Sequence, residues 1–287
     1  MANDPRTGSP LVHAPRSHIH VEASTGWTAL NLGELWRYRD LLYFLTWRDI
    51  KVHYKQTLLG AAWAVLPPIM TMVVFSFFFG NLANLPSEGL PYPIYIYSGM
   101  LPWQLFTYAL NASGNSLVNN RGLITKVYFP RLIVPFSAVL AGLVDFGISF
   151  IVLLVLMAYY GITPTLAVVF LPLMVLLALA TALAAGLWLS ALNARYRDIR
   201  YILPFLTQFW FFLTPVAYST SVLPAWLQPL VLLNPMTGVV TGFRWALLGI
   251  GEVAGGGVIL AALMVVVVFW AGLAYFRRME RDFVDRL

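Results

Sequence analysis

Six runs of about 20 predominantly apolar residues recur along this chain and constrain its fold more than any other feature. An α-helix needs about 20 such residues to cross the roughly 30 Å hydrocarbon core of a bilayer. The runs therefore predict an all-α integral membrane protein with six transmembrane helices, the fifth being the shortest. They lie at residues 59–81, 95–118, 132–160, 165–192, 202–217 and 257–276.

Composition supports a membrane protein and excludes several other classes. Of the 287 residues, 60% are hydrophobic and 10% are charged, whereas a soluble domain carries about 25% charged residues. The chain has no Cys and only four His residues, three in the polar N-terminal tail and one apart from them, so we expect no disulfide and no metal site. We expect no cofactor to be bound by this chain.

The segment between the fifth and sixth runs, residues 222–249, holds two shorter apolar stretches separated by Asn234-Pro235. Each stretch has only about 12 to 16 residues, too few to cross a bilayer. We therefore expect two short re-entrant or interfacial helices on the periplasmic side. If both crossed instead, the number of spans would be eight, which is still even.

The distribution of cations along the chain predicts its topology. In a six-span arrangement every Lys and Arg except Arg244 falls on one side of the membrane. Because cytoplasmic loops carry an excess of Lys and Arg, that side is expected to be cytoplasmic, with both chain termini. The net charge of +6 is then a topology signal and not a sign of nucleic-acid binding.

These patterns divide the chain into four parts. Residues 1–33 are polar, lack an apolar signal-peptide core and are expected to form a disordered cytoplasmic tail. Residues 34–56 are expected to form an amphipathic interface helix and residues 57–276 the six-helix transmembrane domain. Residues 277–287 are expected to be a cytoplasmic C-terminal tail.

The expected interface helix has an aromatic stripe that suits a membrane surface. Tyr43, Trp47, Ile50 and Tyr54 recur at helical spacing and fall within an arc of about 60°. Cations next to this stripe suit anionic headgroups, although a soluble cytoplasmic helix is an alternative. The basic residues of this region are Arg37, Arg39, Arg48, Lys51 and Lys55.

Polar and aromatic side chains of the second and fifth runs, together with the residue that follows the fifth run, are candidates for lining a conduit. The polar residues of the second run recur every four positions, which suits either a hydrated path or hydrogen bonds between helices. The aromatic residues suit either an interfacial belt or the stacking of sugar rings. The candidates are Thr107, Asn111, Asn115, Trp103, Tyr108, Phe211 and Tyr218.

Asp145 is the only acidic residue well inside a run. An intramembrane carboxylate is a candidate proton relay or ion site, and a hydrogen-bonded structural role is the alternative. No other run contains Lys, Arg or His, which counts against a proton-coupled carrier. No pair of carboxylates and no Ser/His/Asp set suggests an enzyme. The chain also lacks the GxxxxGK[ST] motif, so ATP would have to be bound by another polypeptide.

A series of motifs resembles one family over nearly everything after residue 40: the permease subunits of ATP-binding-cassette type-2 polysaccharide exporters. The family moves O-antigen, capsule or teichoic acid chains. Thr214 stands where the family often has Ser. The motifs are YKQTLLGAAW at 54–63, LPW at 101–103, KVYFPR at 126–131, RD at 197–198, TPVAY at 214–218, NPMT at 234–237 and FRWALLG at 243–249.

The resemblance implies two permeases that form a homodimer in the bacterial inner membrane and two copies of an ATPase subunit holding ATP and Mg²⁺. The implied substrate is a polysaccharide linked to undecaprenyl diphosphate, which the basic residues of the interface helix could meet at the entrance. Residues 119–131 would form the coupling segment against the ATPase, with contacts from Asn120, Arg121, Leu123, Lys126, Tyr128, Phe129 and Arg131. The short helices would form a periplasmic gate containing Asn234, Pro235, Gly238, Gly242 and Arg244.

Two alternatives stay open within transport. One is an ATP-driven exporter of a drug or small lipid, and the other is an ion-coupled secondary carrier dependent on Asp145. A membrane glycosyltransferase would need an acidic cluster at the membrane boundary, which the chain lacks.

Overall fold

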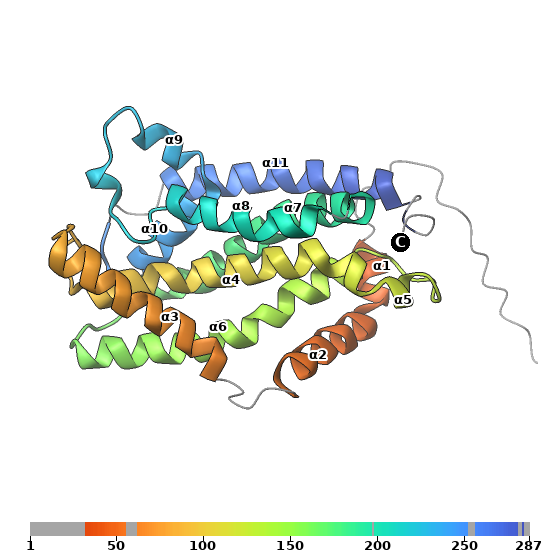
Figure 1. Ribbon diagram of the computed structural model, residues 1–287, viewed down its shortest axis with the longest axis horizontal. Helices are drawn as coiled ribbons and strands as arrows, with labels where there is room; N and C mark the ends of the chain where they lie inside the picture. Colours follow the sequence, from red (N-terminus) through yellow and green to blue (C-terminus); the bar gives the residue numbers. More distant parts are fainter. Residues whose placement is uncertain (1–31, 56–61, 197, 252–255, 281–282, 284–287) are drawn as a thin grey trace, which may run out of the picture.

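The computed structural model describes residues 32–55, 62–196, 198–251, 256–280 and 283. Within these residues the chain is a bundle of helices without strands, and the long helices run along the long axis of the molecule (Figure 1). The helices that build the bundle are α3 (Ala62–Phe75) continued by the π-helical η1 (Ser76–Leu82), α4 (Tyr92–Asn119), α6 (Ile133–Tyr159), α7 (Leu171–Arg195), α8 (Ile199–Leu213) and α11 (Gly256–Met279).

Four helical segments of the described chain are long and apolar enough to cross a membrane. They are Ala62–Leu82, Ile133–Tyr159, Leu166–Arg195, which includes the 3₁₀ helix η2 (Leu166–Phe170), and Gly256–Met279. The integral-membrane, all-helical architecture is therefore as predicted. The first, third, fourth and sixth runs each match one of these segments.

The other two predicted spans do not meet the same criteria, so the total of six stays a prediction. Helix α4 has 28 residues, but its Thr and Asn side chains lower its hydropathy. Helix α8 has 15 residues, which extend only about 22 Å at 1.5 Å per residue. The expected end of the fifth span at Ala217 is wrong, because the helix stops at Leu213, before Pro215.

The ends of the chain differ in detail from the expectation. The interface helix is two helices, α1 (Leu32–Arg37) and α2 (Arg39–Lys55), while Gln56 and residues 1–31 of the expected tail lie outside the described residues. Helix α11 continues three residues beyond the expected end of the sixth span, and Phe283 is fully buried with its ring 5.3 Å from that of Phe276. The expected C-terminal tail is therefore packed at its start.

Helix α4 forms the centre of the bundle and contacts α3, α6, α7, α8 and α10 (Pro235–Leu248). A close crossing joins it to α7, because a Cβ at Gly186 would lie 2.4 Å from Ser113 Oγ. Small residues at such crossings let helices approach in a membrane, where apolar surface alone gives little drive for association. The core is thus arranged around the helix that carries the polar stripe.

The two ends of the bundle differ in charge. One end holds α5 (Arg121–Ile124), the start of α8 and the end of α11, and the other holds η3 (Thr220–Val222), α9 (Gln228–Leu232) and α10 (Figure 1). We call these the cationic end and the α10 end. The cations at the cationic end include Arg121, Lys126, Arg131, Arg195, Arg200, Arg277 and Arg278.

Candidate functional site

Two helices leave apolar stripes uncovered on either side of α4. Only 6% of the apolar window of the α3–η1 segment is buried, against 22–33% in the other three candidate spans. Helix α8 turns Leu203 and Thr207 inward and leaves its other face uncovered. The exposed residues include Trp63, Leu66, Met70, Val73, Val74 and Phe77 on α3 and η1, and Ile202, Phe205, Phe209 and Phe212 on α8.

An aromatic cluster closes the space between these two helices near the α10 end. Phe75 stacks on Phe79 and on Phe211, with ring centroids 5.2 and 5.9 Å apart. Phe211 also meets the edge of Trp103 of α4 at 5.6 Å. The cluster therefore joins α3, η1, α4 and α8 through ring contacts.

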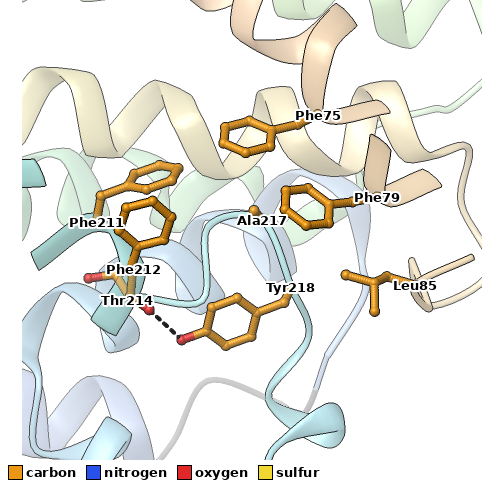
Figure 2. Close-up of a pocket in the computed structure, with 8 residues that line it drawn as sticks. All are labelled: Phe75, Phe79, Leu85, Phe211, Phe212, Thr214, Ala217 and Tyr218. Carbon is orange, nitrogen blue, oxygen red and sulfur yellow. Dashed lines mark hydrogen bonds between the residues drawn. The ribbon is translucent and has the colours of Figure 1, made fainter. Parts of the chain in front are cut away.

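Beside this cluster lies a small apolar cavity of about 70 Å³. Figure 2 shows the rings of Phe79, Phe211, Phe212 and Tyr218 around it, with the Tyr218 hydroxyl donating to the Phe212 carbonyl at 3.0 Å. The remaining lining residues are Phe75, Leu85, Thr214 and Ala217. We call this the aromatic pocket.

The structure brings together most of the aromatic residues expected to line a conduit. Trp103 and Phe211 are in contact, and Phe211 and Tyr218 line the same pocket. Tyr108 lies elsewhere, with its ring 6.0 Å from that of His53 of α2. Phe75 and Phe79 were missed, because their run of apolar residues has the same pattern as any lipid-facing helix.

The polar stripe of α4 makes both local and interhelical hydrogen bonds. The Asn111 amide donates to the Thr107 carbonyl at 2.8 Å, and the Asn115 amide donates to the Asn111 carbonyl at 2.9 Å. Asn193 of α7 donates to Asn115 Oδ1 at 3.0 Å, which supports the interhelical interpretation at that position. The Thr107 hydroxyl is buried without a described partner.

The chain after α8, residues 214–217, forms an elbow that leads into the aromatic pocket. Asn234, the N-cap of α10, accepts from Trp210 Nε1 at 2.9 Å and donates to Thr214 Oγ1 at 2.8 Å. The Tyr92 hydroxyl donates to the Ala217 carbonyl. Side chains of α4 and α10 thereby hold the elbow.

Arg244 is the central contact of this elbow. Its side chain is only 4% exposed, and its guanidinium carbon lies 3.8 Å from the centre of the Tyr95 ring. One terminal nitrogen donates to the Tyr95 hydroxyl at 3.1 Å and to the Pro215 carbonyl at 2.8 Å. The other donates to the carbonyls of Tyr95 and Val216. No carboxylate of the described residues lies within ion-pair distance of Arg244, so carbonyl oxygens replace a counter-ion.

The two glycines of the expected gate mark where α10 packs closely. A Cβ at Gly238 would lie 2.7 Å from Ala261 Cβ of α11, and one at Gly242 would lie 2.5 Å from the Met174 sulfur of α7. The GxxxG motif therefore allows a close helix contact, as its spacing predicts. Pro235 occupies the first turn of α10, where its missing N–H costs nothing.

The coupling segment divides into buried anchors and an exposed surface. Phe129 is 5% exposed, whereas the neighbouring Tyr128 is 73% exposed. Arg121 and Lys126 are also exposed, and Leu123 is half-buried. The remaining two residues face the chain itself, since Asn120 accepts from Arg48 at 2.6 Å and Arg131 donates to the Glu280 carbonyl.

The basic residues of α1 and α2 differ in how far other side chains of the protein already bind their charged groups. Arg48 donates to Asp49 and Asn120, so its guanidinium is held by the protein. Lys51 lies over Trp47 at 5.3 Å, and Arg39 lies over Trp36 at 5.2 Å beside Asp40. Arg37 and Lys55 are exposed.

A bundle with several apolar helices of membrane-spanning length and a cationic end defines a polytopic integral membrane protein. The ABC-2 type transporter family matches residues 40–248, and the chain belongs to this family.

Relatives with assigned names cover most of the chain. An O-antigen export system permease protein RfbA of Myxococcus xanthus is 32% identical over 259 residues, covering 88% of this chain and 98% of that protein. A protein of the same name from Klebsiella pneumoniae is 28% identical, covering 75% and 81% of the two chains. The polysialic acid transport protein KpsM of Escherichia coli is 23% identical, covering 81% and 91%.

Proposed function

We propose that this chain is the permease subunit of an ATP-driven exporter that moves a lipid-linked polysaccharide out of the cytoplasm across the inner membrane. The observation that carries the proposal is the likeness over 98% of the length of a protein named as an O-antigen export permease. O-antigen, capsule and teichoic acid are polysaccharides of the same class, and undecaprenyl diphosphate is the proposed lipid carrier.

The coupling segment is the proposed contact with two copies of an ATPase subunit that bind ATP and Mg²⁺. Its exposed residues include Tyr128 and Arg121, and both residue types are enriched in protein interfaces. Its buried residues, Ile124 and Phe129, belong to the hydrophobic core that includes α4. A push on the exposed surface would therefore reach the bundle through packed side chains, because cores resist compression.

A second copy of the chain is the proposed cover for the uncovered stripes of α3 and α8. A two-fold arrangement would place the α4 stripe and the aromatic pocket of both copies beside a shared conduit. A single bundle of closely packed helices has no bore of glycan width. Sugar rings would stack on Phe211, Tyr218 and their neighbours, while hydroxyls would meet the polar groups of Thr107 and Asn111.

The proposed entrance for the lipid diphosphate lies along α1 and α2, where a diphosphate would meet cations beside an aromatic stripe. Arg37, Arg39, Lys51 and Lys55 are its best candidates. Arg48 was expected to join them, but its guanidinium is engaged by Asp49 and Asn120. Near the α10 end, the proposed gate consists of α9, α10 and the elbow that Arg244 holds.

Stimulation of ATP hydrolysis in the purified complex tests the proposal. Undecaprenyl-diphosphate-linked polysaccharide should raise the hydrolysis rate of the complex in nanodiscs, and a lipophilic drug should not. The opposite pattern would indicate a drug or small-lipid exporter. Uptake that depends on Asp145 and needs no ATPase subunit would indicate an ion-coupled carrier.

A further inference from the structure

The intramembrane carboxylate Asp145 is not used by the proposed transport path. It lies in α6 with its side chain 23% exposed, and it is the only acidic residue within an apolar run. An ionised side chain at such a depth is costly unless it has partners. Its partners therefore indicate what the residue does.

Both carboxylate oxygens of Asp145 face α2. The Tyr54 hydroxyl donates to Oδ1, and His53 Nε2 lies 3.5 Å from Oδ2, which makes an ion pair whenever the imidazole is protonated. His53 also meets Tyr108 of α4 edge to face. Burial and the hydrogen bond to Asp145 raise the pKa of Tyr54, so the phenol remains the donor at neutral pH. Two consecutive residues near the end of α2 are thus held against the third predicted span.

A second polar contact holds the middle of α2. Arg48 Nη2 donates to Asn120 Oδ1 at 2.6 Å and to Asp49 Oδ1 at 2.7 Å, which fixes the guanidinium in place. Asn120 closes α4, and its amide donates to the Ser116 carbonyl at 2.9 Å. This contact therefore joins α2 to the junction between α4 and the coupling segment.

These polar contacts matter because α2 buries little apolar surface. Leu45 is its only buried residue, while Tyr43, Phe44 and Val52 are more than 60% exposed. Apolar packing is the usual source of helix stability in a fold. Leu41 and Leu42 are only partly buried against the core, so the polar attachments supplement a limited apolar contact in setting the position of α2.

We propose that Asp145 is a positioning residue that, together with Asn120, attaches α2 to the bundle at two points, so that α2 and the coupling segment move as one unit. The attachment stands on the contacts above, and its role in transmitting force from an ATPase rests on the proposed function. Asp145 then acts through Tyr54 and His53 and does not carry an ion.

Hydrogen–deuterium exchange of α2 in the full chain, reconstituted in lipid nanodiscs, tests the attachment. Losing one charge-assisted hydrogen bond should speed exchange in the second half of α2 about tenfold in Tyr54→Phe and in Asp145→Leu. The double variant should exchange no faster than the faster single variant, because both changes remove the same contact. Tyr43→Phe is the matched control, since Tyr43 lies on the same helix and is 71% exposed.

Arg48→Gln tests the second point in the same assay, with Arg39→Gln as its control because the described contacts of Arg39 are with Trp36 and Asp40, its neighbours in sequence. Unchanged exchange in Tyr54→Phe, or multiplying effects in the double variant, would overturn the proposal. If the Asp145→Leu variant fails to insert into the membrane, the exchange rate of Tyr54→Phe by itself tests the attachment of α2. The assay contains neither ATPase nor polysaccharide, so its outcome is separate from that of the proposed function.

Discussion

Arg244 shows how a single residue can be kept charged inside a membrane protein. Its donors meet carbonyls of the elbow and of α4, which are strong acceptors for a cation. The space for the guanidinium comes from Gly99, where a Cβ would lie 2.4 Å from Arg244 Nη2. Arg244, the one cation outside the expected cytoplasmic side, is therefore an internal clamp that positions residues 215–217.

The clamp predicts coupling between residues 99 and 244. Gly99→Ala should destabilise the native chain by displacing the guanidinium, yet it should cost less in an Arg244→Lys background, where that nitrogen is missing. We expect a coupling energy of about 1–2 kcal/mol between the two sites, measured from unfolding in SDS titrations. If the stability losses of the two single variants sum to that of the double variant within about 0.3 kcal/mol, the two residues act independently.

At the scale of elements, much of the fold was predictable from hydropathy. Long apolar runs predicted α6, the continuous η2–α7 segment and α11 to within a few residues, because a bilayer imposes length and composition on any spanning helix. The end of α8 was not predictable from hydropathy, since residues 214–217 are as apolar as the helix. Its elbow is held by Asn234, Arg244 and Tyr92, which are far away in sequence.

Part of the candidate site was also predictable from the sequence, and the rest was not. Spacing placed Asn111 and Asn115 on one face of α4, which is a local property of a helix. Local spacing could not predict the contact of Trp103 with Phe211, nor the engagement of Arg48 by Asn120, because both depend on packing between distant segments. Asp145 was recognisable as unusual, but its partners Tyr54 and His53 were not.

The different burial of two adjacent aromatic residues in the coupling segment predicts different losses of stability on their replacement. Phe129→Ala should destabilise the chain by about 3 kcal/mol, because it removes a buried ring from the core. Tyr128→Ala should change stability by less than about 0.5 kcal/mol, because the ring is exposed.

The two variants are compared by unfolding in SDS and by co-purification of the ATPase. We expect Tyr128→Ala to weaken ATPase binding while leaving the fold intact. Equal stability losses in the two variants, or full ATPase binding by Tyr128→Ala, would contradict this division of the segment.

At the scale of the whole molecule, α3 and α8, which carry the uncovered apolar stripes, both contact α4, the helix with the polar stripe. Lipid alone could cover them, but a second copy would also bring two aromatic pockets together. An isologous interface needs one self-complementary surface. The α3–η1 segment is the least buried of the four candidate spans, and both it and α8 contribute residues to the aromatic pocket.

This assignment predicts that a bulky substitution on α3 disrupts dimers. Val74→Trp should shift the purified chain from dimer to monomer by steric mismatch, as measured by light scattering in mild detergent. Val267→Trp on α11 is the matched control, because both valines are more than 50% exposed on candidate spans. A monomeric Val267→Trp beside a dimeric Val74→Trp would place the interface on the other face.

The central claim is that the cationic end faces the cytoplasm and meets the ATPase, while the aromatic pocket lies near the opposite surface. The chain has no Cys, so single cysteines can be labelled without background. Thr125→Cys marks the cationic end and Ser221→Cys the α10 end, and both native residues are small, polar and exposed. In intact cells made permeable only at the outer membrane, a membrane-impermeant maleimide should label Cys at 221 and spare Cys at 125. Labelling of position 125 with protection of position 221 would reverse the orientation and contradict the account.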